Sequence, residues 1–160
     1  MTIAIGDALP AATLVKMTAD GPEKVETKEF FPGKRVALFS VPGAFTPTCS
    51  ARHLPGYIDK AAELKAKGID AIVGTAVNDA FVMGAWGNAA GAGDAVTLLA
   101  DGNADFVKAM GLEFDGSPFG MGTRGKRFAM VVNDGKVEKL FVEAPGEFKV
   151  SSADYMLAEL

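Results

Sequence analysis

The stretch Val-Pro-Gly-Ala-Phe-Thr-Pro-Thr-Cys-Ser, residues 41–50, joins two segments of different character. Before it, residues 35–41 form an apolar run that predicts a buried strand, and after it residues 50–67 have a mostly helical pattern. Cys49 therefore lies at a strand-to-helix turn, in or just before the first helical turn. Unpaired backbone N–H groups and the positive end of the helix dipole collect there, and they favour a thiolate, which is the nucleophile, over a thiol.

The bulk composition predicts one domain, residues 1–160, with a sizeable core. The net charge of -4 gives no electrostatic reason to expect nucleic acid or an anionic membrane as a partner. No apolar run is long enough to span a bilayer, and the N-terminus lacks the features of a secretory signal. Because one cysteine cannot form an internal disulfide, a reducing cytoplasm is the expected location.

The pattern along the rest of the chain alternates between strands and helices. We expect strands over residues 12–17, 24–27, 69–77, 96–100, 128–132 and 137–142, helices over 80–88, 103–110 and 155–160, and a glycine-rich loop over 112–125. Pro55 and Gly56 predict a kink or break in the helix after Cys49. This order predicts an α/β fold with helices flanking a mixed central sheet, parallel first and antiparallel at the end. A thioredoxin-like topology is one member of that class, and periodicity alone does not select it.

A cation near the sulfur would increase the thiolate fraction, because an isolated thiol has a pKa of about 8.5. Arg127 and Arg124 are the candidates, at the start of the strand expected over 128–132. If that strand neighbours the one ending at Val41, an arginine can reach Cys49. Its guanidinium also suits a substrate rich in oxygen, because it donates several hydrogen bonds and stays charged.

Three further residues of the turn predict a small polar pocket. Thr46 lies three residues before Cys49, and its hydroxyl can donate one hydrogen bond and accept others. Pro42 and Pro47 stiffen the turn and remove backbone donors. A thiolate, a hydroxyl and a guanidinium around such a pocket suit attack by sulfur on the O–O bond of a peroxide, which gives a sulfenic acid.

Each of these residues also has an ordinary structural interpretation. A lone cysteine is often a buried, inert side chain, and a threonine before a helix can simply be its cap. Surface arginines are usually solvated or paired with an acid. His53 lies four residues after Cys49 on the same helical face, where it could lower the thiol pKa, act as a base or make a structural hydrogen bond.

The motif Pro42-x-x-x-Thr46-x-x-Cys49 resembles the active-site signature of the peroxiredoxins. The longer text over 41–50, with His-Leu-Pro-Gly-Tyr over 53–57, resembles the type II (atypical) branch. Further matching stretches lie at residues 77–82, 85–87, 99–101, 126–128 and 150–152, so the resemblance covers nearly the whole chain.

The resemblance implies a thioredoxin-like fold and thiol peroxidase activity on hydrogen peroxide and alkyl hydroperoxides, with no metal or prosthetic group. It implies that Cys49 is the peroxidatic cysteine, that Thr46 binds the peroxide and that Arg127 activates both thiolate and peroxide. Pro42 would shield the site, and Arg124 would be a secondary member of the network. It also implies a homodimer formed through the face near the site, with Phe45, residues 81–86 and Phe119 in the contact.

The chain departs from some type II relatives, which have a second cysteine that resolves the sulfenic acid. One such position is Gly74 here, and the other falls within Phe-Lys-Val-Ser-Ser over 148–152. Resolution would then come from an external thiol: glutathione with or without glutaredoxin, or a thioredoxin-like dithiol. Without an internal trap, prolonged peroxide should drive Cys49 to sulfinic acid.

Three other functions compete with a one-cysteine peroxidase. A thioredoxin-type disulfide reductase is disfavoured because Cys49-Ser-Ala-Arg52 lacks the second cysteine of a C-x-x-C pair. A cysteine hydrolase would draw both Cys49 and His53 from one short helix, whereas triads normally take nucleophile and base from separate segments. A non-enzymatic chaperone or redox-sensing partner would need no tuned thiol.

Overall fold

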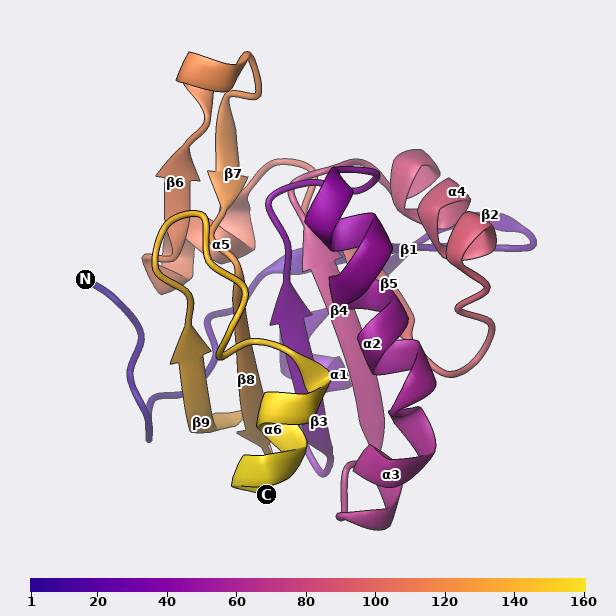
Figure 1. Cartoon of the computed structure of the whole chain (residues 1–160), viewed down its shortest axis with the longest axis vertical. Coiled ribbons are helices and arrows are strands. Elements are labelled where there is room, and N and C mark those ends of the chain that lie inside the picture. The colour runs from indigo at the N-terminus through magenta and orange to yellow at the C-terminus, as the bar shows by residue number, and fades with distance from the viewer.

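A seven-stranded mixed sheet forms the centre of the computed structural model, which describes residues 1–160 (Figure 1). The strands are β1 (Thr13–Thr18), β2 (Gly21–Glu26), β3 (Arg35–Ser40), β4 (Ala71–Ala76), β5 (Thr97–Ala100), β6 (Glu113–Asp115), β7 (Thr123–Gly125), β8 (Phe128–Asn133) and β9 (Lys136–Val142). The helices are α1 (Thr27–Phe30), α2 (Leu54–Asp59), α3 (Ala61–Ala66), α4 (Ala80–Ala90), α5 (Asp105–Met110) and α6 (Ala153–Glu159), with a π-helical turn (Cys49–His53) and a 3₁₀ turn (Ser117–Phe119). No helix has the length and apolarity that crossing a membrane requires.

The strand order β2-β1-β5-β4-β3-β8-β9 confirms the mixed sheet expected from the sequence. The three central strands β3, β4 and β5 pair in parallel, and β8 and β9 continue the sheet antiparallel to β3. The β1–β2 hairpin also joins antiparallel, through β5, so both borders are antiparallel and not only the later one. The pairing of Ser40 with Phe128 brings the residue before β8 close to the end of β3.

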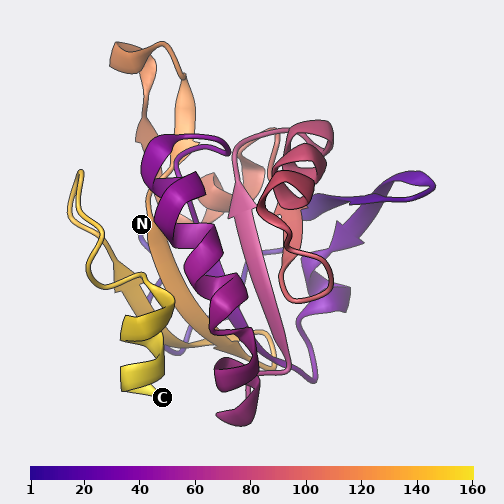
Figure 2. The ribbon, with the colours of Figure 1, turned by 45° about the vertical axis from the view of Figure 1, so that its right-hand side comes forward.

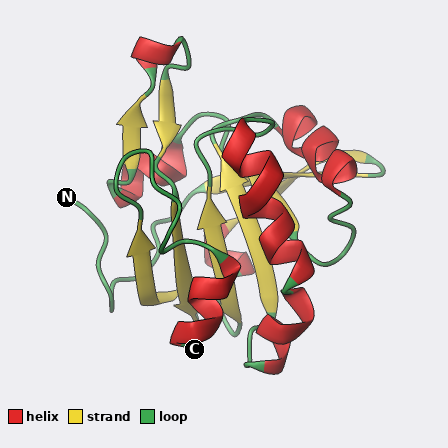
Figure 3. Ribbon diagram, viewed as in Figure 1, coloured by secondary structure: helices red, strands yellow, loops and turns green.

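Alternating side chains of β3 supply two separate cores, which is why this strand is apolar throughout. Ala37 and Phe39 point to one face of the sheet, and Val36 and Leu38 point to the other. Helices α2, α3, α4 and α6 cover the first face, and α1 and α5 lie behind the sheet on the second (Figures 2 and 3). The two apolar layers hold β3 rigidly, so the turn that follows it starts from a fixed point.

Two local expectations were wrong in ways that bear on the site. The glycine-rich segment 112–125 forms a hairpin of β6 and β7, which projects from the body beside the end of β3 (Figure 1). The helix after Cys49 does not break at Pro55: the chain stays helical from Pro47 to Asp59, and the π-helical turn lies just before this proline. The irregularity lies earlier, in the π-helical turn, and later, at Lys60 between α2 and α3.

Candidate active site

The cysteine turn buries its sulfur completely. Helical structure begins at Pro47, so Cys49 lies in the first turn, and its side chain has 0% exposure. The residue before Thr46, Phe45, has a φ of 65°, a left-handed conformation that folds the loop back on itself. The backbone N–H groups of Thr48 and Cys49 donate no hydrogen bond within the chain, as is usual at the start of a helix. Two donors are therefore free for a bound oxygen atom.

The guanidinium of Arg127 is the polar partner of this sulfur. Its Nη2 donates to Cys49 Sγ at 3.0 Å, and its Nη1 lies 2.8 Å from His53 Nδ1. Arg127 directly precedes β8, so the pairing of β8 with β3 sets the position of the guanidinium over the turn. The fork of one arginine thus contacts the sulfur and an imidazole together, a geometry that a lysine cannot reproduce.

The hydrogen bonds of His53 determine its tautomer. Because Arg127 can only donate, Nδ1 of His53 accepts, and the proton lies on Nε2, which donates to the Ser151 carbonyl at 3.0 Å. The ring is fully buried and packs against Phe39 and Phe148, at centroid distances of 5.0 and 4.9 Å. Burial, and then the charge of Arg127, lower the pKa of His53 from 6.5 to about 3. The imidazole is neutral at pH 7 and both its nitrogens are engaged, which favours the structural hydrogen bond over a base.

We expect His53 to make the fold sensitive to acid. The unfolded chain protonates this histidine near pH 6.5 and the folded chain only near pH 3. Between those values the unfolded state binds more protons, so stability is lost as the pH falls. By pH 4 the free energy of unfolding should drop by about 3 kcal/mol through this residue alone. Urea titrations at pH 7 and pH 4 should show this extra loss in the wild type and not in His53→Gln; equal losses would contradict it.

The other predicted site residues lie around the mouth of the turn. The half-buried Thr46 donates its hydroxyl proton to the Gly43 carbonyl at 2.7 Å, so towards a ligand its oxygen can only accept. Arg124 does not contact the sulfur: its Nη1 donates to the carbonyl of Pro42 at 3.2 Å, and its Nε donates to the Met121 carbonyl at 3.0 Å. Arg124 therefore ties the β6–β7 hairpin to the loop that contains Pro42.

Two contacts of the turn were not expected from the sequence. Trp86 on α4 donates its indole N–H to Ser50 Oγ at 3.0 Å, and the side chain of Asn78 accepts from the Ala44 N–H at 2.9 Å. Both fix the turn to the loop and helix that follow β4. The position of Asn78 directly after a buried strand is the only signal in the sequence, and it is equally typical of a helix cap.

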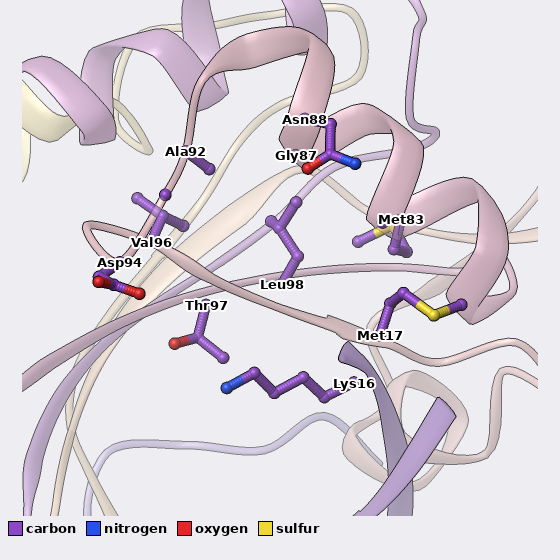
Figure 4. Close-up of a pocket in the computed structure, with 12 residues that line it drawn as sticks. Lys16, Met17, Met83, Gly87, Asn88, Ala92, Asp94, Val96, Thr97 and Leu98 are labelled. Atoms are coloured by element: carbon purple, nitrogen blue, oxygen red, sulfur yellow. The ribbon is translucent and has the colours of Figure 1, made fainter. Parts of the chain in front are cut away.

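A cavity of about 300 Å³ lies elsewhere, between α4 and the strands β1 and β5 (Figure 4). Met83 and Gly87 of α4 form one wall, and Met17, Thr97 and Leu98 form the other. No cysteine, histidine or arginine lines it, so it has none of the chemistry of the cysteine turn. No group of three or more His, Cys, Asp or Glu side chains is placed to hold a metal ion.

Comparisons with known proteins match nearly the whole chain. The sequence matches the Redoxin family over residues 4–157. Peroxiredoxin-2E-2, chloroplastic, of Oryza sativa subsp. japonica is 53% identical over 164 residues, which are 99% of this chain and 73% of that protein. The crystal structure of reduced Prx3 in complex with H2O2 from Vibrio vulnificus has a TM-score of 0.95 at 53% identity, covering 99% of each chain.

A further similar structure, from Burkholderia cenocepacia, is described as a putative thioredoxin reductase. It has a TM-score of 0.98 at 49% identity, and the match covers 100% of this chain and 99% of that one. A dithiol reductase needs a second cysteine beside the first, and Cys49 is alone in this chain. The contacts of its sulfur are therefore the better guide to the chemistry.

Proposed function

The chain belongs to the peroxiredoxin family of thiol peroxidases, and from this premise we propose that Cys49 is the sulfur that reduces the peroxide. The thioredoxin-like fold expected from the sequence is confirmed by the same comparisons. One observation supports the assignment above all others: the Arg127 guanidinium donates to Cys49 Sγ at 3.0 Å, and this cysteine is fully buried. A cation so placed favours the thiolate and the charge that develops on oxygen.

In the proposed reaction the thiolate of Cys49 attacks one oxygen of hydrogen peroxide or an alkyl hydroperoxide. The S–O bond forms as the O–O bond breaks, and the displaced oxygen leaves with the electron pair and takes the proton of the attacked oxygen. Sulfur is oxidised by two electrons to a sulfenate, which takes up a proton from solvent, and the peroxide becomes water or an alcohol. In this proposal Arg127, which contacts the sulfur, and the N–H of Cys49, which has no partner in the chain, stabilise the oxygens during transfer.

In this reaction Thr46 accepts a hydrogen bond from the peroxide hydroxyl, because its own hydroxyl proton is donated to the Gly43 carbonyl. Replacing Thr46 with valine keeps the shape and removes this acceptor. We expect the second-order rate of Cys49 oxidation to fall by about 5- to 150-fold, since a buried donor left without its acceptor costs about 1–3 kcal/mol. Thr48→Val is the matched control, because the Thr48 hydroxyl makes no hydrogen bond in the chain; stopped-flow oxidation should separate the two, and equal rates would remove Thr46 from the mechanism.

We propose that an external thiol restores the sulfur, with glutathione, alone or with glutaredoxin, ranked before thioredoxin. The supporting fact is that the chain has one cysteine and hence no internal partner for the sulfenic acid. These thiols also require a reducing compartment, and we place the protein in the cytoplasm, where it would serve antioxidant defence.

Steady-state peroxide consumption, with each thiol supplied in turn, tests the proposal. Glutathione with glutaredoxin should sustain turnover of the wild type, and none of the thiols should sustain turnover of Cys49→Ser. Turnover with thioredoxin alone would reverse the ranking of the reductants and leave the peroxidase itself intact.

We further propose a homodimer formed through exposed apolar residues near the cysteine turn. Phe45, Phe81 and Phe119 are 54%, 68% and 75% exposed, although large apolar side chains are costly to leave in water. Their segments, the cysteine turn, the start of α4 and the β6–β7 hairpin, lie at the same end of the molecule (Figures 1 and 2). Sedimentation equilibrium should give twice the 16.6 kDa of the chain, and Phe119→Asp should shift it towards one copy. Ile5→Asp, at another exposed apolar residue, is the control.

A further inference from the structure

One carboxylate near the end of the chain gathers an unusual number of hydrogen bonds. Oε2 of Glu143 accepts from the backbone N–H groups of Lys149, Val150 and Ser151, at 2.7, 2.9 and 2.8 Å, and from the Ser151 hydroxyl at 2.7 Å. Glu143 is buried, with 8% exposure, and no cation pairs with it, because the Lys149 ammonium binds Glu147 instead. The carboxylate charge is therefore met by three amides and a hydroxyl of a single segment, 149–151.

This segment is the one that holds His53. The Ser151 carbonyl accepts from His53 Nε2 at 3.0 Å and from the Tyr57 hydroxyl at 2.8 Å. With its N–H and hydroxyl both bound by Glu143, Ser151 is fixed on one side, and its carbonyl faces the imidazole on the other. The carbonyl keeps the proton of His53 on Nε2, and this leaves Nδ1 free to accept from Arg127.

The two ends of this series of contacts are also joined through the backbone. The N–H of Glu143 donates to the carbonyl of Arg127 at 3.0 Å, which continues the β8–β9 ladder by one step beyond Phe128 and Val142. The residue that bears the carboxylate and the residue that bears the guanidinium thus lie opposite each other. The pairing of β8 with β9 therefore fixes the backbone positions from which both side chains extend.

We propose that Glu143 is a positioning residue for peroxide reduction, an inference that rests on the function proposed above. Its carboxylate shapes segment 149–151 so that the Ser151 carbonyl fixes the His53 tautomer, and His53 Nδ1 in turn aims the Arg127 fork at Cys49 Sγ. Without the carboxylate, the Tyr57 hydroxyl alone holds the carbonyl, the imidazole can exchange its tautomer, and Arg127 loses the acceptor that orients its fork. Glu143 itself contacts neither the sulfur nor the substrate.

The experiment compares Glu143→Gln with Glu147→Gln, a change of the same kind in the same loop at the surface. Stopped-flow oxidation by hydrogen peroxide, followed through the single tryptophan Trp86, should be about 10- to 30-fold slower in Glu143→Gln and within twofold of the wild type in Glu147→Gln. In an Arg127→Ala background, Glu143→Gln should add less than a twofold loss, because its effect acts through that arginine. Equal rates in the two glutamine variants, or full additivity with Arg127→Ala, would overturn the proposal.

A second readout does not depend on peroxide. The chain has one histidine, so its ¹⁵N imidazole signals belong to His53 and report the tautomer directly. The wild type should show one tautomer, protonated at Nε2, and Glu143→Gln should show a mixture; a single unchanged tautomer would overturn the proposal even if the rate falls. Should the proposed peroxidase function itself fail, the mixture in Glu143→Gln would still establish the contacts from Glu143 to His53.

If Glu143→Gln does not fold, Ser151→Ala removes only one of the four donors and keeps the carbonyl. It should move the His53 signals in the same direction and slow the oxidation two- to fivefold. Wild-type signals together with a wild-type rate in Ser151→Ala would overturn the proposal.

Discussion

Replacement of Cys49 by serine should abolish peroxide consumption, leaving only the background reaction between peroxide and the added thiol. The sulfur gives up two electrons in the proposed reaction, and a serine oxygen at the same position cannot form a stable equivalent of the sulfenic acid. The chain has no second cysteine that could take over. Peroxide consumption, measured with glutathione and glutaredoxin for both proteins, gives the result directly.

The loss in Cys49→Ser must be separated from a loss of fold. Serine is close to cysteine in size, and Arg127 remains to donate a hydrogen bond to its oxygen, so the thermal midpoint should change little. A folded Cys49→Ser protein with activity comparable to the wild type would exclude the one-cysteine peroxidase.

The second large effect is expected at Arg127. Its replacement by alanine removes both the donor to Cys49 Sγ and the donor to His53 Nδ1, together with a half-buried positive charge. We expect the second-order rate of sulfenate formation to fall on the order of 10²–10³-fold, the usual cost of removing one donor aimed at a developing anion. Stopped-flow oxidation followed by mass spectrometry of Cys49 should establish it.

Two further arginine variants separate charge from geometry. Arg127→Lys keeps the charge and cannot reach the sulfur and the imidazole together, so it should stay at least about tenfold slower than the wild type. Arg124→Ala removes a comparable cation that binds only the carbonyls of Pro42 and Met121, and its loss should be below tenfold. If Arg124→Ala and Arg127→Ala lose the same factor, the effect is one of net charge and the assigned geometry is wrong.

The fold could be predicted where the sequence pattern depends on burial alone. β3 and β4 are buried on both faces, so their apolar runs stand out, and the hairpin of β8 and β9 is marked by Asn-Asp-Gly at its turn. The β6–β7 hairpin was missed because its pairing has few apolar positions and depends on glycines such as Gly116, which lies against the Gly122 carbonyl. The π-helical turn was missed because it covers only five residues, Cys49–His53, too few to show a hydrophobic period of their own.

The candidate site was predictable only where its residues adjoin Cys49 along the chain or follow from strand order. Thr46, Pro42 and Cys49 belong to one turn, and Arg127 could be named because two neighbouring strands bring their ends together. The partners of His53 could not be predicted, since Ser151 is 98 positions away and its carbonyl is a backbone group without any sequence signature. The role of Glu143 could not be predicted either, because the sequence does not distinguish a buried glutamate bound by backbone amides from a glutamate at the surface.

The enclosure of Cys49 has a consequence for the timing of the catalytic cycle. An atom with no exposed surface is closed even to a molecule the size of water, so hydrogen peroxide reaches the sulfur only after a small shift of the turn, whereas glutathione or a glutaredoxin needs a much larger opening. We therefore expect oxidation to need only a small shift of the closed turn, and reduction to wait until the turn at 49–53 unwinds. Until the turn unwinds, a second peroxide can oxidise the sulfenic acid further. The rate of unwinding, and not the supply of thiol, then decides whether reduction or the second oxidation comes first.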